Sequence, residues 1–132
     1  MRVLLLFCLL AALPPAHGGT VAYWRFEEGQ GTQASDASGN GNTGALVAGA
    51  TFTQDVPIAV LPNAFALNFD GTGGVSIPDS PSLRPATALT LEAWIRPTAA
   101  AWVIMGKQLD GCCANSFAME IHGVVRFILT DP

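Results

Sequence analysis

Apolar residues that recur at every second position constrain this chain of 132 residues more than any other feature of its sequence. Across residues 65–69, large apolar side chains alternate with small or polar ones, and residues 75–77 and 89–96 repeat this pattern. A period of two is typical of a β-strand with one buried face. Asp70-Gly71 and a loop with three prolines separate the three runs, and both are turn signals. This part of the chain is therefore predicted to form three β-strands joined by turns.

The rest of the chain has the same strand-and-turn character. Further strands are predicted at residues 21–26, once or twice within 44–60, and at 102–107, 117–121 and 124–130. The last two are expected to form a hairpin around His122-Gly123. The polar segment of residues 27–42 has no helical period, and no repeat at solenoid or propeller spacing is visible. The sequence therefore predicts an all-β protein.

Residues 1–18 are predicted to be a secretory signal peptide. A short positively charged start is followed by an unbroken apolar run, and small residues lie one and three positions before a cleavage point after Gly18. The apolar run is about half of the roughly 20 residues that a membrane-spanning helix needs. The protein is therefore expected to be secreted or extracellular, with residues 19–132 as one domain and no membrane insertion after removal of the signal.

The charge balance argues against two classes of partner. The chain has six basic and ten acidic residues, a formal net charge of −4, and no basic cluster. Nucleic acids and anionic membranes are bound through basic stripes that neutralise phosphates. Neither is therefore expected as a partner.

Two adjacent cysteines, Cys112 and Cys113, lie in a predicted loop. Secretion permits disulfides, but neighbouring Cα atoms are about 3.8 Å apart, closer than the usual disulfide range, so a bridge between these two would be strained. The alternatives are free thiols and partners beyond Pro132. No histidine or cysteine is spaced to complete a metal site with them.

Five short motifs follow one another in a particular order. They are Val21-Ala-Tyr-Trp-Arg-Phe-Glu-Glu-Gly, Asp36-Ala-Ser-Gly-Asn-Gly-Asn, Leu67-Asn-Phe-Asp-Gly, Val75-Ser-Ile-Pro and Leu89-Thr-Leu-Glu-Ala-Trp-Ile-Arg-Pro. Their order and spacing resemble laminin G-like, concanavalin A-like jelly-roll domains. The resemblance implies an antiparallel two-sheet sandwich, which secreted multidomain proteins commonly carry as a carbohydrate-binding or adhesive module, often with calcium. The family's later strands would follow Pro132, so residues 19–132 are expected to be a partial domain, incomplete at the C-terminus.

The loop that begins at Asp36 offers oxygen ligands of the kind that calcium prefers. Asp36, Asn40 and Asn42 supply carboxylate and amide oxygens on a glycine-rich frame, and Asp70 can add a carboxylate. The closing glutamate of an EF-hand is absent. The sequence thus predicts a calcium site at these four residues. The alternative is a solvated turn held by its own side chains, and the position of Asp70 is equally explained by its Asp-Gly turn.

Four residues are candidates for binding a sugar. Aromatic faces stack on sugar rings, while carboxylates and other polar groups hold the hydroxyls. Glu92, Trp94 and Arg96 share one side of a predicted strand, and Trp102 lies at the end of a loop. The alternative is that Trp94 fills a core layer while its two neighbours pair with each other. Trp24 is expected in the core.

Catalysis has little support in the sequence. The Glu-x-Asp-x-x-Glu strand of glycan-cleaving jelly-roll enzymes is absent, Glu92 and Glu120 are isolated, and His122 has no serine or cysteine partner in a motif. We therefore expect a secreted, non-catalytic recognition module of a larger extracellular protein, with a glycan or an extracellular protein as its partner. The alternatives are a calcium-stabilised structural or adhesive spacer and, less favoured, the start of a glycan-cleaving enzyme.

Overall fold

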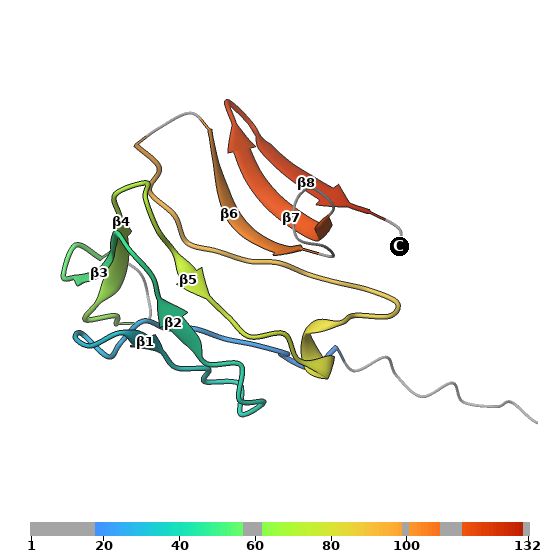
Figure 1. Ribbon diagram of the computed structural model, residues 1–132, viewed down its shortest axis with the longest axis horizontal. Helices are drawn as coiled ribbons and strands as arrows, with labels where there is room; N and C mark the ends of the chain where they lie inside the picture. Colours follow the sequence, from blue (N-terminus) through green and yellow to red (C-terminus); the bar gives the residue numbers. More distant parts are fainter. Residues whose placement is uncertain (1–17, 57–61, 99–100, 109–114, 131–132) are drawn as a thin grey trace, which may run out of the picture. The chain divides into compact units, whose positions relative to one another are not determined.

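The computed structural model describes residues 18–56, 62–98, 101–108 and 115–130. Within these ranges it contains eight strands in three antiparallel sheets, and its only helical element is a short 3-10 helix (Figure 1). The chain divides into two compact units, an N-terminal unit, Met1–Arg84, and a C-terminal unit, Pro85–Pro132. The prediction of an all-β protein is confirmed.

Two small sheets make up the N-terminal unit. The first contains β1 (Gln33–Ala34), β2 (Gly44–Leu46) and β5 (Val75–Ser76), with β2 in the middle, and the second pairs β3 (Ala50–Thr53) with β4 (Ala66–Phe69). A side chain at Gly44 would collide with the side chain of Val75, so a glycine allows β2 to approach its neighbour closely. The strands predicted within residues 44–60, 65–69 and 75–77 are confirmed.

The strand predicted at residues 21–26 is wrong, because only one antiparallel bridge forms there, between Trp24 and Asp36. Two local features explain the difference. The backbone N–H of Tyr23 donates to the Asp36 carboxylate at 3.0 Å instead of to a strand. Phe26 has a φ of 60°, which turns the chain out of the extended conformation. Alternating side chains did not produce a strand here because the backbone donors found other acceptors.

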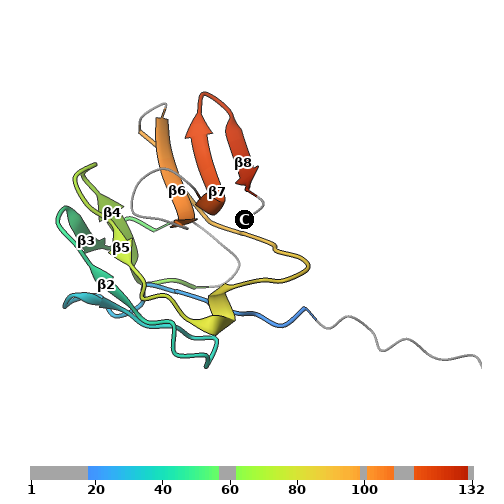
Figure 2. The ribbon, with the colours of Figure 1, turned by 45° about the vertical axis from the view of Figure 1, so that its right-hand side comes forward.

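The C-terminal unit contains one sheet of three long strands. These are β6 (Ala101–Gln108), β7 (Asn115–His122) and β8 (Val125–Leu129), with β7 in the middle and both pairs antiparallel. Figures 1 and 2 show β8 at one edge of this sheet. The predicted hairpin is confirmed, since Gly123 takes a φ of 73° in the turn and the His122 N–H donates to the Val124 carbonyl at 3.0 Å.

The strand predicted over residues 89–96 is wrong. The structure describes all of these residues and assigns them no strand, and Trp94 in the middle of the segment is 86% exposed. An alternating sequence becomes a strand only where another strand satisfies its backbone groups. Residues 89–96 have the alternation without such a partner.

Few described side chains are fully buried, and one of them is polar. The buried apolar residues in the described ranges are Ala34, Phe117 and Ala118, and the buried polar residue is Asn42. No helix in this part of the chain is long and apolar enough to cross a membrane. A buried amide costs free energy unless its polar atoms are hydrogen-bonded, so the surroundings of Asn42 show what holds the N-terminal unit together.

Candidate functional site

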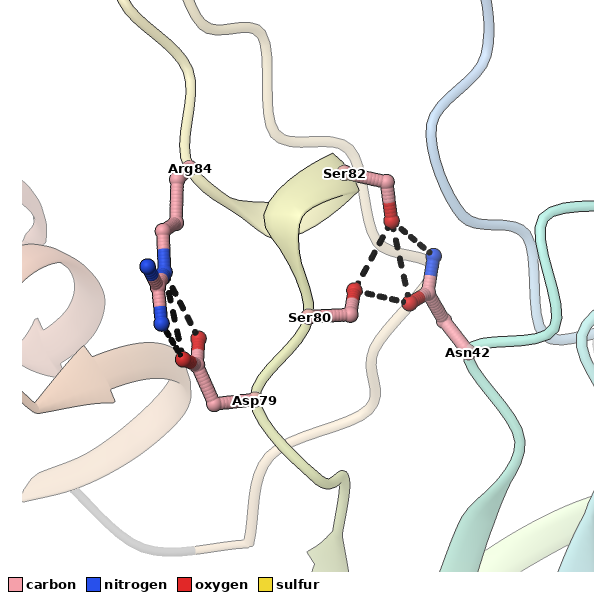
Figure 3. Close-up of polar contacts among 5 residues, drawn as sticks. All are labelled: Asn42, Asp79, Ser80, Ser82 and Arg84. Carbon is pink, nitrogen blue, oxygen red and sulfur yellow. Dashed lines mark hydrogen bonds and ion pairs between the residues drawn. The ribbon is translucent and has the colours of Figure 1, made fainter.

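Asn42 is the centre of a polar cluster in the N-terminal unit and is only 3% exposed. Its Nδ2 donates to the Val21 carbonyl and to Ser82 Oγ, both at 3.0 Å. Its Oδ1 accepts from Ser80 Oγ at 2.6 Å and from Ser82 Oγ at 3.1 Å. Figure 3 shows the amide facing both hydroxyls. Each polar atom of this side chain therefore has partners, which offsets its burial.

The cluster joins segments that are far apart in the sequence. Ser80 is the N-cap residue of the 3-10 helix η1 (Pro81–Leu83), but its hydroxyl bonds Asn42 rather than the helix backbone. From the other side, Trp24 Nε1 donates to the Asn42 carbonyl at 2.8 Å. Trp24, which the sequence places in the core, is half-buried and anchored by its polar edge.

An ion pair lies beside this cluster, between Asp79 and Arg84 at the two ends of the 3-10 turn (Figure 3). Arg84 Nε donates to Asp79 Oδ2 at 3.1 Å, and the hydrogen bond and charge of Asp79 raise the pKa of Arg84. Both side chains are exposed, so the pair contributes little to stability. The Asn42 hydrogen bonds hold the turn more strongly.

The Asp36 carboxylate organises the loop that leads to Asn42. Oδ1 accepts from the backbone N–H groups of Tyr23 at 3.0 Å and Ser38 at 2.8 Å. Oδ2 accepts from Ser38 Oγ at 2.8 Å and from the Asn42 N–H at 2.9 Å. Burial raises the pKa of Asp36, but these hydrogen bonds outweigh it and lower the pKa to about 2. The carboxylate is therefore held ionised by the chain itself.

Asn40 completes the contacts between this loop and the N-terminal segment. Its Nδ2 donates to the Thr20 carbonyl at 3.2 Å and to the Val21 carbonyl at 2.9 Å. Ser38 Oγ donates to the same Val21 carbonyl at 3.0 Å. Side chains of the loop thus donate hydrogen bonds to main-chain carbonyls of the preceding segment and hold the two together.

Several polar groups predicted to bind calcium have hydrogen-bond partners within the chain. The ion needs six to eight oxygens that converge on one point. Asp36 already has four donors on its two oxygens, Asn40 directs its amide nitrogen to carbonyls, and the Asn42 Oδ1 is taken by two serines. In the described part of the chain, no group of three or more histidine, cysteine, aspartate or glutamate residues is placed to hold a metal. These contacts are those expected of the alternative, a turn held by its own side chains, and the calcium site stays a prediction from the sequence.

Asp70, the fourth predicted calcium ligand, makes its contacts in a turn of its own. Its Oδ1 accepts from the Thr72 N–H at 2.8 Å and from Thr72 Oγ1 at 2.7 Å. These bonds lower the pKa of Asp70. Asp70 thus serves its Asp-Gly turn, as the alternative to metal binding proposed.

The predicted sugar-binding residues lie in the C-terminal unit. Glu92, Trp94 and Arg96 are all exposed, and they lie along the segment that forms no strand. The alternative in which Trp94 fills a core layer is wrong, because its side chain is 86% exposed. Trp102 lies on β6, and its side chain is outside the described residues, as are Cys112 and Cys113.

Ser80 and Ser82 are members of the cluster that the sequence alone did not indicate. They lie 38 and 40 residues from Asn42, beyond the reach of any local pattern. The signal that could have pointed to them is a Ser-Pro-Ser segment after a proline-ended strand, since such hydroxyls often bond a nearby backbone or amide.

Comparisons of the chain with models of protein families, with curated proteins and with solved structures find no match. Its function must therefore be inferred from its own geometry and motifs.

Replacing Asn42 by alanine is expected to lower the free energy of unfolding by about 1–3 kcal/mol, because two serine hydroxyls lose their amide partner and the Val21 carbonyl loses one of its three side-chain donors. Urea unfolding followed by tryptophan fluorescence measures this. Asn68→Ala, at an exposed position on β4, is the matched control and should change stability by less than about 0.5 kcal/mol. Equal losses in the two variants would contradict the role of the cluster.

The Asp36→Asn variant is expected to be less stable than the natural chain at pH 7, by roughly 1–2 kcal/mol after screening by solvent. A carboxyl whose pKa falls from about 3.9 when unfolded to about 2 when folded stabilises the fold above the unfolded value. That contribution is lost as the pH falls through about 2. The difference between the two proteins should therefore shrink from pH 4 downward. Glu92→Gln controls for the loss of one negative charge. If the stability of Glu92→Gln changed with pH in the same way as that of Asp36→Asn, the role assigned to the Asp36 hydrogen bonds would be refuted.

Proposed function

We propose that this protein is a secreted, non-catalytic recognition module that binds a glycan and belongs to a larger extracellular protein. The observation that carries the proposal is Trp94, which is 86% exposed and lies between the exposed residues Glu92 and Arg96. Indole is a large apolar surface with a polar edge, and it stacks on the apolar face of a sugar ring. Glu92 lies two residues before Trp94 and Arg96 two residues after it. Their carboxylate and guanidinium can hydrogen-bond the hydroxyls of a sugar ring.

The setting of these residues supports the same proposal. Residues 85–98 connect the 3-10 helix to β6 without strand pairing, so their side chains reach solvent. Binding residues are found more often on such connections than within the sheets that hold them. Trp94, at 86% exposed, can therefore meet a ligand without any rearrangement of the three-stranded sheet that follows it.

The fold that we propose with this function is the antiparallel jelly-roll sandwich of laminin G-like domains. It is supported by eight strands that pair only antiparallel within the described ranges, and by the order of the five sequence motifs. Double-sheet jelly rolls are built from strands paired in this way.

A second candidate function is a structural or adhesive spacer, and the polar cluster around Asn42 favours it. A spacer must keep its shape without a ligand, and the hydrogen bonds of Asp36 and Asn42 join three segments of the N-terminal unit in this manner. Calcium stabilisation of this spacer stays a prediction from the sequence. The four hydrogen bonds that Asp36 already accepts argue against it.

Trp94→Ala is expected to weaken glycan binding about five- to twelvefold, because loss of one stacked aromatic removes roughly 1–1.5 kcal/mol. Glycan-array screening identifies the ligand, and affinity electrophoresis compares the variants. Ile95→Ala is the matched control, since this neighbouring apolar residue is also exposed but has no aromatic ring to stack on a sugar. If binding persists in folded Trp94→Ala and Trp102→Ala proteins, both aromatic platforms are excluded, whereas a natural chain that binds no glycan on the array favours the spacer.

Calcium titration followed by thermal melting tests whether calcium stabilises the proposed spacer. A cation that binds the native state at a hundredfold excess over its Kd would stabilise the protein by about 2.7 kcal/mol and raise the Tm. Because the chain already supplies the partners of Asp36, we expect no rise in Tm at millimolar calcium. A rise that disappears in Asp36→Asn would contradict this expectation and establish calcium at this loop.

A further inference from the structure

Asn40 is followed by Gly41, and both residues are exposed in the loop that Asp36 organises. An asparagine in this position can lose its side-chain amide without an enzyme. The glycine nitrogen attacks Cγ of the asparagine, a new N–C bond closes a succinimide ring, and the amide nitrogen leaves as ammonia with the proton that the glycine N–H gives up. Water then opens the ring at either carbonyl, which yields aspartate or isoaspartate. One water is consumed and one ammonia is released.

The surroundings of Gly41 leave its nitrogen free for this attack. A side-chain carbon placed on Gly41 would meet nothing within 4 Å, so the residue borders open space that water can enter. Among the residues that the structure describes, none forms a hydrogen bond with the Gly41 N–H. Gly41 also has a φ of 77°, in the left-handed region that glycine adopts without strain. The nitrogen can therefore move toward Cγ of Asn40 without giving up a bond of its own.

The other asparagines with described side chains lack this combination. Asn42 is buried and precedes a β-branched threonine, whose side chain crowds the attacking nitrogen. After Asn63, the N–H of Ala64 is engaged, because it donates to Glu27 Oε2 at 3.0 Å. Asn68 is exposed, but a phenylalanine follows it within the paired strand β4. Within this set, exposure, a following glycine and an unbonded nitrogen coincide at Asn40.

The amide of Asn40 is also a fastening of the N-terminal segment. Its Nδ2 donates to the carbonyls of Thr20 at 3.2 Å and Val21 at 2.9 Å, and to Ser38 Oγ at 3.1 Å. An ionised aspartate has acceptor oxygens and no donor. After deamidation, a negatively charged oxygen would therefore face two carbonyl oxygens, and attraction would become repulsion.

The loss would fall mainly on the start of the segment. The Val21 carbonyl keeps its donors from Ser38 and Asn42 at 3.0 Å each, whereas Asn40 is the donor that holds the Thr20 carbonyl. The new charge would also lie in the same loop as the Asp36 carboxylate, and an added negative charge beside an acidic residue disrupts by repulsion. An isoaspartate would further lengthen the main chain of this loop by one carbon.

We propose that Asn40 is a site of spontaneous deamidation, and that its conversion to aspartate or isoaspartate loosens the contact between residues 20–23 and the loop. The reaction needs only water besides the chain itself. It couples the age of the protein to the order of its N-terminal segment.

Incubation of the full natural chain at mildly alkaline pH, followed by peptide mass spectrometry, tests the chemistry. The peptide that contains Asn40 should gain the mass difference between OH and NH2, and faster at higher pH because the attacking nitrogen must lose its proton. Asn68 is the internal control and should keep its amide over the same period. Asn40→Gln should resist the reaction, because its longer side chain closes a less favourable ring.

Hydrogen exchange tests the structural consequence. The Tyr23 N–H, which donates to Asp36, should exchange roughly fivefold faster in Asn40→Asp, the change expected when about one hydrogen bond is lost. Asn68→Asp is the matched control, because it adds the same charge at an exposed position on β4. Exchange within β7 should be equal in both variants, which shows that each is folded. Aged natural protein supplies the same comparison if Asn40→Asp does not fold.

Two outcomes would overturn the proposal. The first is an Asn40 that keeps its amide for as long as Asn68 does. The second is equal exchange at Tyr23 in the Asn40→Asp and Asn68→Asp proteins, or in fresh and deamidated natural chain, because the amide would then not be what holds the segment.

Discussion

The buried amide of Asn42 is the interaction on which the N-terminal unit depends. An amide removed from water must find a partner for each polar atom, and Asn42 finds them in the Val21 carbonyl and the hydroxyls of Ser80 and Ser82. Each such bond contributes only about 1 kcal/mol net, but leaving one of these groups unpaired costs more than the bond contributes. The cluster therefore restricts the arrangement of three segments that would otherwise have only short strands to hold them.

Asp36 also holds chain segments together by hydrogen bonds, through a charged carboxylate instead of an amide. Its carboxylate collects three backbone N–H groups and one hydroxyl, as a bound anion would at a turn rich in donors. The same donors depress its pKa and hold the carboxylate ionised.

The C-terminal unit is organised by a different principle. Its three strands follow one another as neighbours in the sequence, so each pairing is local and the sheet needs no polar cluster to define its register. The residues proposed to meet a glycan lie in the connection that precedes this sheet.

The alternation of side chains is a local property, and it was enough to predict the all-β class, the hairpin at Gly123 and the strands β4 to β8 to within two residues at most ends. It predicted a strand over residues 89–96 as well, where none forms, because pairing depends on what lies across from a segment. The sequence by itself also determined that Asp36, Asn40 and Asn42 act together, since they share one short loop.

Tertiary structure alone decided what these residues do. Whether the oxygens of the loop face an ion or hydrogen-bond donors depends on the backbone of Tyr23 and on Ser80 and Ser82, about 40 residues away in the case of the serines. The exposure of Trp94 was decided in the same way, because an indole is buried only where another segment covers it. Residue type and spacing determine which partners a side chain can accept, and folding determines which of those partners it meets.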